Sequence, residues 1–216
     1  MTTKVLLGKD EIRSLKTLVE KLIFWDYRST LRIQIKNSNI GLFGSTPFNC
    51  LAFLALPLQK PNAEIDLVIN AGEIAKQLKD ENLIELLLID SNKPAPELAL
   101  LPPIGPWMPG EKGIAGDILP IVKSRLEKLK AQIEPLEMLA SDSTRDSVTE
   151  TAWNENLWGG IPFGALNVAA AIGMLTFPGA RVNAATCQGW KRFVTPSGQV
   201  FVRPQKAVRT LLSVVK

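Results

Sequence analysis

The chain has 216 residues, of which 46% are hydrophobic and 21% charged, and its formal net charge is +4. This composition suits one folded domain or two small ones and excludes a mainly disordered chain. The sequence contains no histidine, which removes the most common general base, metal ligand and partner of a catalytic serine or cysteine. Cys50 and Cys187 lie far apart without a CxxC pattern, so a zinc site and a disulfide framework are not expected. We expect no metal and no cofactor.

The apolar segments are too short for a membrane protein. The longest, such as residues 165–177, fall below the roughly 18 to 20 residues that a spanning helix needs. The apolar stretch near the N-terminus is also shorter than the roughly 7 to 15 residues of a secretory signal. We therefore expect a cytoplasmic protein that makes no membrane contact, and the sequence does not indicate its oligomeric state.

The first part of the chain has the patterns of an α+β fold. Apolar residues at helical spacing predict an amphipathic helix over residues 9–24. Alternation or short apolar runs predict strands at residues 31–36, 40–43, 48–56, 64–69 and 83–89. The first two form a hairpin, and the third is expected to lie centrally in the sheet. Asn70, followed by Glu73, is a capping signal for a helix over residues 71–80.

A stretch dense in proline and glycine follows. Six prolines and four glycines lie between residues 91 and 116, a density that breaks regular structure. We therefore divide the chain into an α+β N-terminal half at residues 1–92, a Pro/Gly-rich junction at residues 93–116 and a helical module at residues 117–216.

The last part predicts three helices and then a hairpin. The helices cover residues 117–135, 146–157 and 162–175, and the hairpin strands cover residues 190–195 and 199–203. This three-helix plus β-hairpin order is that of a winged helix. The third helix offers only Asn167 to a base edge and carries no cation, so we expect it to be buried in the core.

Charge placement is the feature of the sequence that bears most on function. Residues 156–216 carry seven basic and no acidic side chains. Cations interleaved with aromatic residues are typical of surfaces that bind nucleic acid without sequence preference, and an acidic protein partner would suit them equally. The alternative is a solvated basic sheet with its aromatic residues packed inward. The candidate binding residues are Arg181, Trp190, Lys191, Arg192, Arg203, Lys206 and Arg209.

No motif assigns a catalytic residue. The spacing of Gly110, Gly113 and Gly116 fits no dinucleotide fingerprint. The leading hypothesis is therefore a non-enzymatic interaction protein with a basic C-terminal face. Two alternatives remain: a purely structural or oligomerising protein, and an enzyme with a cleft at the junction. Residues that could line such a cleft are Trp107, Glu111, Lys112 and Asp117.

Two resemblances add to this interpretation. At residues 102–107, 158–160 and 190–202 the chain resembles an uncharacterised family of actinobacterial proteins, which has no assigned activity and implies only a cytoplasmic setting. Residues 9–90 resemble one repeat of a DNA sliding clamp, in a helix, several strands and a strand that leads into a second helix. The clamp resemblance implies helices that line a DNA channel with cations, here Lys9, Arg13, Lys16, Lys76 and Lys79.

Overall fold

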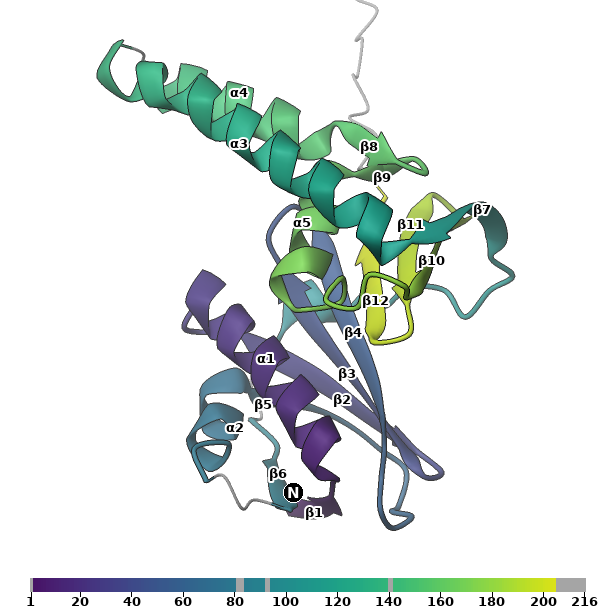
Figure 1. The fold of residues 1–216 in the computed structure, drawn as a ribbon. Coiled ribbons are helices and arrows are strands. Elements are labelled where there is room, and N and C mark those ends of the chain that lie inside the picture. Colours follow the sequence, from purple (N-terminus) through teal and green to yellow (C-terminus); the bar gives the residue numbers. More distant parts are fainter. Residues whose placement is uncertain (1, 81–83, 92–93, 140–141, 205–216) are drawn as a thin grey trace, which may run out of the picture.

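The computed structural model describes residues 2–80, 84–91, 94–139 and 142–204. They form a mixed α and β fold around an eight-stranded antiparallel sheet with the strand order β5-β2-β3-β4-β12-β11-β10-β7 (Figure 1). The strands of this sheet are β2 Thr30–Lys36, β3 Asn39–Thr46, β4 Cys50–Pro57, β5 Ile65–Asn70, β7 Met108–Ile114, β10 Arg181–Cys187, β11 Trp190–Thr195 and β12 Gly198–Val202. Two further pairs are β1 Thr2–Leu6 with β6 Glu85–Ile89, and β8 Asn156–Trp158 with β9 Ile161–Pro162.

The helices pack on one face of the sheet, which we call the inner face. They are α1 Lys9–Trp25, α2 Ala71–Gln77, α3 Ala115–Leu139, α4 Asp142–Asn154 and α5 Phe163–Ala171. The α1 helix buries Leu15, Leu18 and Leu22. Its fit is close, because a Cβ added at Gly44 of β3 would lie 2.6 Å from Cδ1 of Leu22. Gly44 therefore lets this helix approach the sheet.

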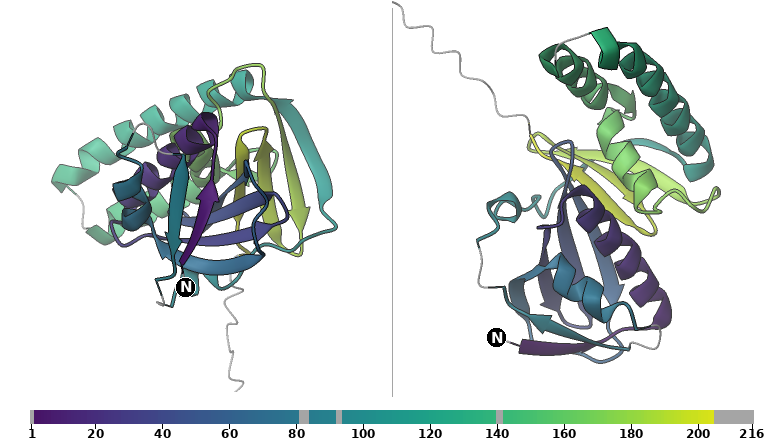
Figure 2. Two further views of the ribbon diagram at one scale, coloured as in Figure 1. Left: turned by 90° about the horizontal axis from the view of Figure 1, so that it is seen from below. Right: turned by 90° about the vertical axis from the view of Figure 1, so that its left-hand side faces the viewer.

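The opposite, outer face of the sheet is crossed by residues 94–107, which we call the strap (Figure 2). The strap contains a short 3-10 helix, Pro96–Leu98. A second apolar cluster, separate from the main core, forms beneath it. Its buried members are Phe43, Leu51, Leu98, Trp190 and Phe201, with Trp107 packed against them.

Both halves of the sheet contain a meander of three strands. β2, β3 and β4 form the first, β10, β11 and β12 form the second, and β4 pairs with β12 from Phe53↔Gln199 to Cys50↔Val202. The backbone ladder is thus continuous between the two meanders. The division of the chain at residues 93–116 remains a prediction.

Most of the predicted elements are present. The helix at residues 9–24, the hairpin at residues 31–43, the strand at residues 48–56 in the middle of the sheet and the C-terminal hairpin all form. Asn70 caps α2 as predicted, since its Oδ1 accepts a hydrogen bond of 2.8 Å from the Gly72 N–H.

The winged-helix-like order is not found. The pair β8 and β9 separates α4 from α5, and β10 stands between α5 and the hairpin. β7 also forms within the stretch where proline and glycine were expected to break regular structure. The predicted burial of the third helix is confirmed, because Phe163, Leu166 and Val168 of α5 are fully buried. None of the described helices is long and apolar enough to cross a membrane.

Candidate basic interface and the hairpin-tip pocket

Strand alternation divides the predicted cations between the two faces of the sheet. Side chains that stand opposite one another on paired strands share a face, and neighbours along a strand point to opposite faces. Arg192 stands opposite Phe201, a member of the outer cluster, so it lies on the outer face. Lys191 therefore lies on the inner face, with Phe193 of the main core. The two adjacent cations thus cannot belong to one surface.

The outer cations contact the strap. Cζ of Arg192 lies 4.5 Å from the centre of the Trp107 ring, a cation–π contact. Arg203 donates hydrogen bonds to the backbone carbonyls of Cys50 and Glu97. Burial lowers the pKa of both guanidinium groups below the usual arginine value. The hydrogen-bond and ring partners of the two groups are neutral backbone oxygens and an aromatic ring.

Trp190 is not available for stacking on a base. Only 4% of it is exposed, because it lies in the cluster beneath the strap. Arg181 is exposed at the start of β10, where it pairs with Ile114 of β7. Lys112 of β7 is exposed and stands opposite Asn183. Lys206 and Arg209 lie outside the described residues.

At the N-terminal end of the outer face, the cation is already paired. Arg32 makes two hydrogen bonds of 2.8 Å to the carboxylate of Asp66, and its Nη1 donates to the Leu98 carbonyl of the strap. The Arg32 guanidinium lowers the pKa of Asp66 below its usual value. Arg32 therefore has its charge matched by a carboxylate, whereas the ring and hydrogen-bond partners of Arg192 and Arg203 are neutral.

A pocket of about 290 Å³ lies where the turns of two hairpins meet the helical layer, and we call it the hairpin-tip pocket. Its walls come from segments far apart in the sequence: the β3/β4 turn, the end of α4, the β8/β9 pair, the β10/β11 turn and the C-terminal meander. Its lining contains no carboxylate side chain. The lining residues are Phe48, Asn49, Asn154, Asn156, Pro162, Gly189, Lys191, Val202 and Arg203.

Lys191 provides the ammonium group of this pocket. Its Nζ donates to Asn156 Oδ1 at 2.8 Å and to the Gly160 carbonyl at 2.6 Å. Both partners are neutral, and burial lowers the pKa of Lys191 below its usual value. An ammonium group here is partly desolvated without an opposite charge in the pocket lining.

The β3/β4 turn is held in an unusual backbone conformation. Phe48 has φ +64° and Asn49 has φ +58°. This left-handed region is unfavourable for a bulky residue such as phenylalanine, whereas asparagine tolerates it. The Phe48 ring stacks on Trp153 at 4.2 Å between ring centres, and Trp153 stacks on Phe163 at 4.5 Å. This aromatic ladder fixes the wall of the pocket.

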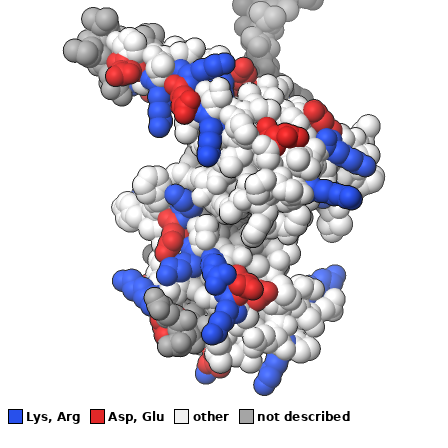
Figure 3. Space-filling view, in the orientation of Figure 1, with Lys and Arg blue, Asp and Glu red and all other residues white. Residues whose placement is uncertain are grey.

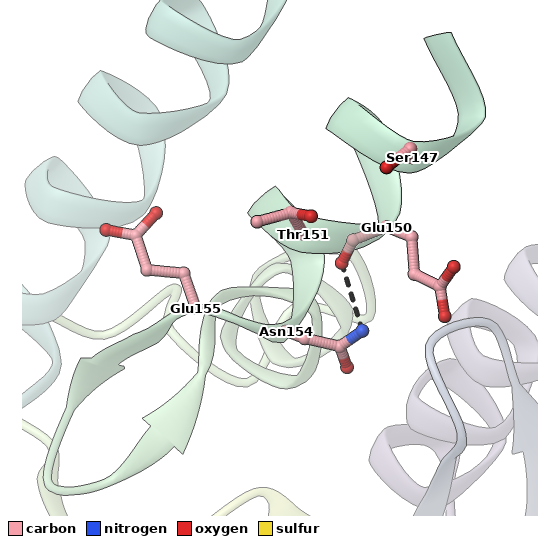
Figure 4. A pocket seen from close by; sticks show the side chains of 5 residues that line it. All are labelled: Ser147, Glu150, Thr151, Asn154 and Glu155. Carbon is pink, nitrogen blue, oxygen red and sulfur yellow. Dashed lines mark hydrogen bonds between the residues drawn. The ribbon is translucent and has the colours of Figure 1, made fainter. Parts of the chain in front are cut away.

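A neighbouring hollow of about 480 Å³ is shaped differently (Figure 4). It is lined by Ser147, Glu150, Thr151, Asn154 and Glu155. Glu155 already accepts hydrogen bonds from Arg125. All five come from a single stretch of chain, and both charged side chains among them are acidic, so this hollow offers no cation to an anionic ligand.

The residues proposed for a junction cleft take different positions. Trp107 packs on Phe201, with 5.7 Å between ring centres, and its Nε1 donates to the Pro103 carbonyl. Glu111, Lys112 and Asp117 are exposed side chains of β7 and α3. Within the described ranges, no group of three or more cysteine, aspartate or glutamate side chains is placed to hold a metal ion.

The fold is that of DNA polymerase sliding clamps. The DNA polymerase III subunit beta from Pseudomonas aeruginosa aligns with 95% of this chain at a TM-score of 0.62 and 11% identity. A putative beta subunit from Eubacterium rectale aligns with 94% at a TM-score of 0.63 and 8% identity, and the beta subunit from Thermotoga maritima aligns with 94% at 0.53 and 12%. These identities show the fold alone. No family model matches the chain, and no curated protein matches it.

The structural comparisons extend the resemblance seen in the sequence. The likeness to a clamp was predicted for residues 9–90 alone, but the alignments cover nearly the whole chain. The chain in turn spans 63% to 65% of the length of these clamp subunits. Charge and periodicity could not show this, because the C-terminal half repeats a meander without repeating its sequence.

The residues of the hairpin-tip pocket were mostly missed from the sequence. Asn49 and Gly189 carry turn chemistry, and Asn154 and Asn156 lie at the end of a predicted helix. Those signals predict local structure but not that the four residues converge. Only Lys191 and Arg203 were predicted as site residues.

Proposed function

We propose that this chain is a non-enzymatic, clamp-like protein that contacts nucleic acid without sequence preference through the outer basic face. This face consists of Lys112, Arg181, Arg192 and Arg203. The observation that carries the proposal is charge: the described residues 156–204 contain four cations and no carboxylate side chain, and three of the four lie on this one face.

The geometry of the outer face supports contact with a polyanion. Arg192 and Arg203 are held by the strap, and their hydrogen-bond and ring partners are neutral. The Glu97 carboxylate offsets part of the Arg203 charge, so Arg192 has the more available charge for a phosphate backbone. Lys112 and Arg181 are exposed beside them on β7 and β10. The buried position of Trp190 favours phosphate contacts over base stacking.

The clamp resemblance offers a different surface, the helices. Figure 3 shows Lys and Arg side chains over the visible helices, interspersed with Asp and Glu. On α1, Arg13 pairs with Asp10 at 2.9 Å, and on α2, Lys76 pairs with Glu73 at 2.7 Å. This pairing leaves less uncompensated charge on the helices than on the outer face. The proteins of similar fold are named DNA polymerase sliding clamps, which supports nucleic acid as the partner over an acidic protein.

Binding to duplex DNA over a range of salt concentrations tests the proposal. Lys112→Ala/Arg181→Ala removes two outer cations, and Lys9→Ala/Lys16→Ala removes two helical cations as the matched control. If each outer cation contacts one phosphate, the outer pair should reduce the slope of log K against log salt by about 2, and the control should leave it unchanged.

Each other result contradicts the proposal. A lower slope in the helical variant alone would assign binding to the clamp-like helices. No binding near 50 mM salt by a folded protein would exclude non-specific nucleic-acid binding. Binding to polyglutamate that depends on the outer pair, without binding to DNA, would favour an acidic protein partner.

A further inference from the structure

We propose that the hairpin-tip pocket binds a phosphate group. The two sources of that chemistry are a small phosphomonoester and the terminal phosphate of a nucleic acid. The pocket lies on the side of β11 that carries Lys191, and the outer basic face lies on the other. Arg203 belongs to the outer basic face and also borders this pocket, so the inference rests on Lys191, and the variants that test it leave Arg203 unchanged.

The donors of the pocket suit an anion. An ammonium group has three N–H donors, and Lys191 uses two of them on Asn156 Oδ1 and the Gly160 carbonyl. Asn156 accepts with its oxygen, which leaves the N–H donors of its amide for a ligand. Asn49 and Asn154 bring two further amides to the same lining. Each already donates one N–H, Asn49 to the Arg203 carbonyl at 3.4 Å and Asn154 to the Glu150 carbonyl at 3.0 Å, which leaves one N–H on each amide for a ligand. A phosphate has enough acceptor oxygens to use several of these donors together.

The residue types also exclude a cation as the natural occupant. The polar residues that line the pocket beside Lys191 are three asparagines and Arg203, and an aspartate in place of any of the asparagines would have offset the positive charge. The pocket therefore keeps its positive charge. Burial lowers the pKa of Lys191, and a bound anion would raise it.

Contacts within the protein hold the walls of the pocket in place without a ligand. The β3/β4 turn is fixed by the stacking of Phe48 on Trp153, and the β10/β11 turn has φ +49° at Gln188 and +80° at Gly189. Residues held in unfavourable backbone regions are frequent at ligand clamps. The volume of about 290 Å³ is at the small end for a ligand site and suits a phosphate with a compact substituent. Phe48, Pro162 and Val202 supply apolar walls for that substituent.

Phenyl phosphate is the probe for this pocket, measured by titration calorimetry with the full chain. Lys191→Met removes the charge and keeps much of the apolar stem. Asn156→Asp keeps an acceptor for Lys191 and adds a negative charge. We expect either change to weaken binding at least tenfold, as expected for loss of a charged hydrogen bond. Lys112→Met on β7 removes an exposed cation outside the pocket and should change the dissociation constant less than twofold.

A second set of ligands identifies the source and checks selectivity. An oligonucleotide with a 5′-phosphate that binds at least tenfold more tightly than its 5′-hydroxyl form, in a Lys191-dependent way, identifies a nucleic-acid end. If the 5′-phosphate and 5′-hydroxyl oligonucleotides bind equally, and phenyl phosphate binds tightly in a Lys191-dependent way, the ligand is a small phosphomonoester. Benzoate that binds as tightly as phenyl phosphate would overturn the proposal, and so would phenyl phosphate affinity unchanged in folded Lys191→Met. Binding of these small ligands is measured at Lys191, so its outcome does not depend on whether the outer-face variants bind duplex DNA.

Discussion

The contact between Gly164 and Phe48 gives a sharp test of how the pocket wall is fixed. A Cβ at Gly164 of α5 would lie 2.6 Å from Phe48 Cβ and 2.7 Å from its Cγ. Carbon atoms in favourable contact lie about 3.5 to 4.0 Å apart, so Gly164→Ala creates an overlap of roughly 1 Å. Phe48 cannot easily move away, because Trp153 holds its ring and its backbone is already in the left-handed region.

Two opposing terms set the size of the effect. Replacing glycine by alanine in a helix stabilises it by up to about 1 kcal/mol, whereas overpacking a fixed site costs about 1 to 3 kcal/mol. We expect Gly164→Ala to lower the free energy of unfolding by about 1 to 2 kcal/mol. In a Phe48→Gly background the overlapping atoms are absent, and glycine tolerates φ +64°. There the same change should be neutral or stabilising.

Urea unfolding of the four proteins of this double-mutant cycle, followed by tryptophan fluorescence and circular dichroism, measures the coupling free energy. We expect about 1 to 3 kcal/mol. A coupling below about 0.3 kcal/mol would show that the turn adapts to the added methyl group. The pocket wall would then not be rigid, and the claim that the ladder fixes it would be wrong.

Two further predictions concern titratable groups. Burial raises the pKa of Cys50 to about 12. In a Cys187→Ser variant, the native protein should therefore resist iodoacetamide at pH 8 and react only after unfolding, which mass spectrometry would show. Fast labelling of the native state would contradict the burial of Cys50. Arg32 lowers the pKa of Asp66 below its usual 3.8, so the pair stabilises the fold above that pH and loses its effect as the pH falls through the lowered value. Because both side chains are partly exposed, Asp66→Asn should lower the free energy of unfolding by under about 1 kcal/mol at pH 7. Urea unfolding should show this difference between the two proteins shrink toward pH 2. A difference that stays constant with pH would exclude the ion pair as its cause.

Local patterns predicted the elements whose neighbours are close in sequence. Leu31, Ile33 and Ile35 alternate with polar residues, and β2 buries all three. The capping role of Asn70 could be predicted from the sequence because a helix cap involves residues only two or three positions apart. By contrast, β7 has almost no apolar alternation and is exposed along most of its length. It forms because its backbone pairs with β10, some 70 residues further along the chain, and no pattern within β7 reports that partner.

Long-range contacts also decide which side chains of the candidate site are exposed, and local sequence patterns do not predict those contacts. Trp190 was predicted to lie beside the cations on a binding surface, and it is adjacent to them in sequence. Its burial depends on Leu98 and Trp107 of the strap, which reach it across the outer face. A segment rich in proline gives no periodic signal of the face that it will cover. Composition could therefore locate the basic region but not distinguish which of its residues are accessible.

Lys191 and Arg192 explain why the basic segment should not be treated as one surface. As neighbours on a strand they point to opposite faces, and each meets neutral partners there: Asn156 and Gly160 on the inner side, Trp107 on the outer side. A triple substitution that includes both cations would remove charge from both faces and could not identify the surface responsible. Lys191→Met tests only the hairpin-tip pocket, and Lys112→Ala/Arg181→Ala tests only the outer basic face. If the phosphate probe responds to the first variant and duplex DNA to the second, the sheet carries two separate anion sites, one on each face.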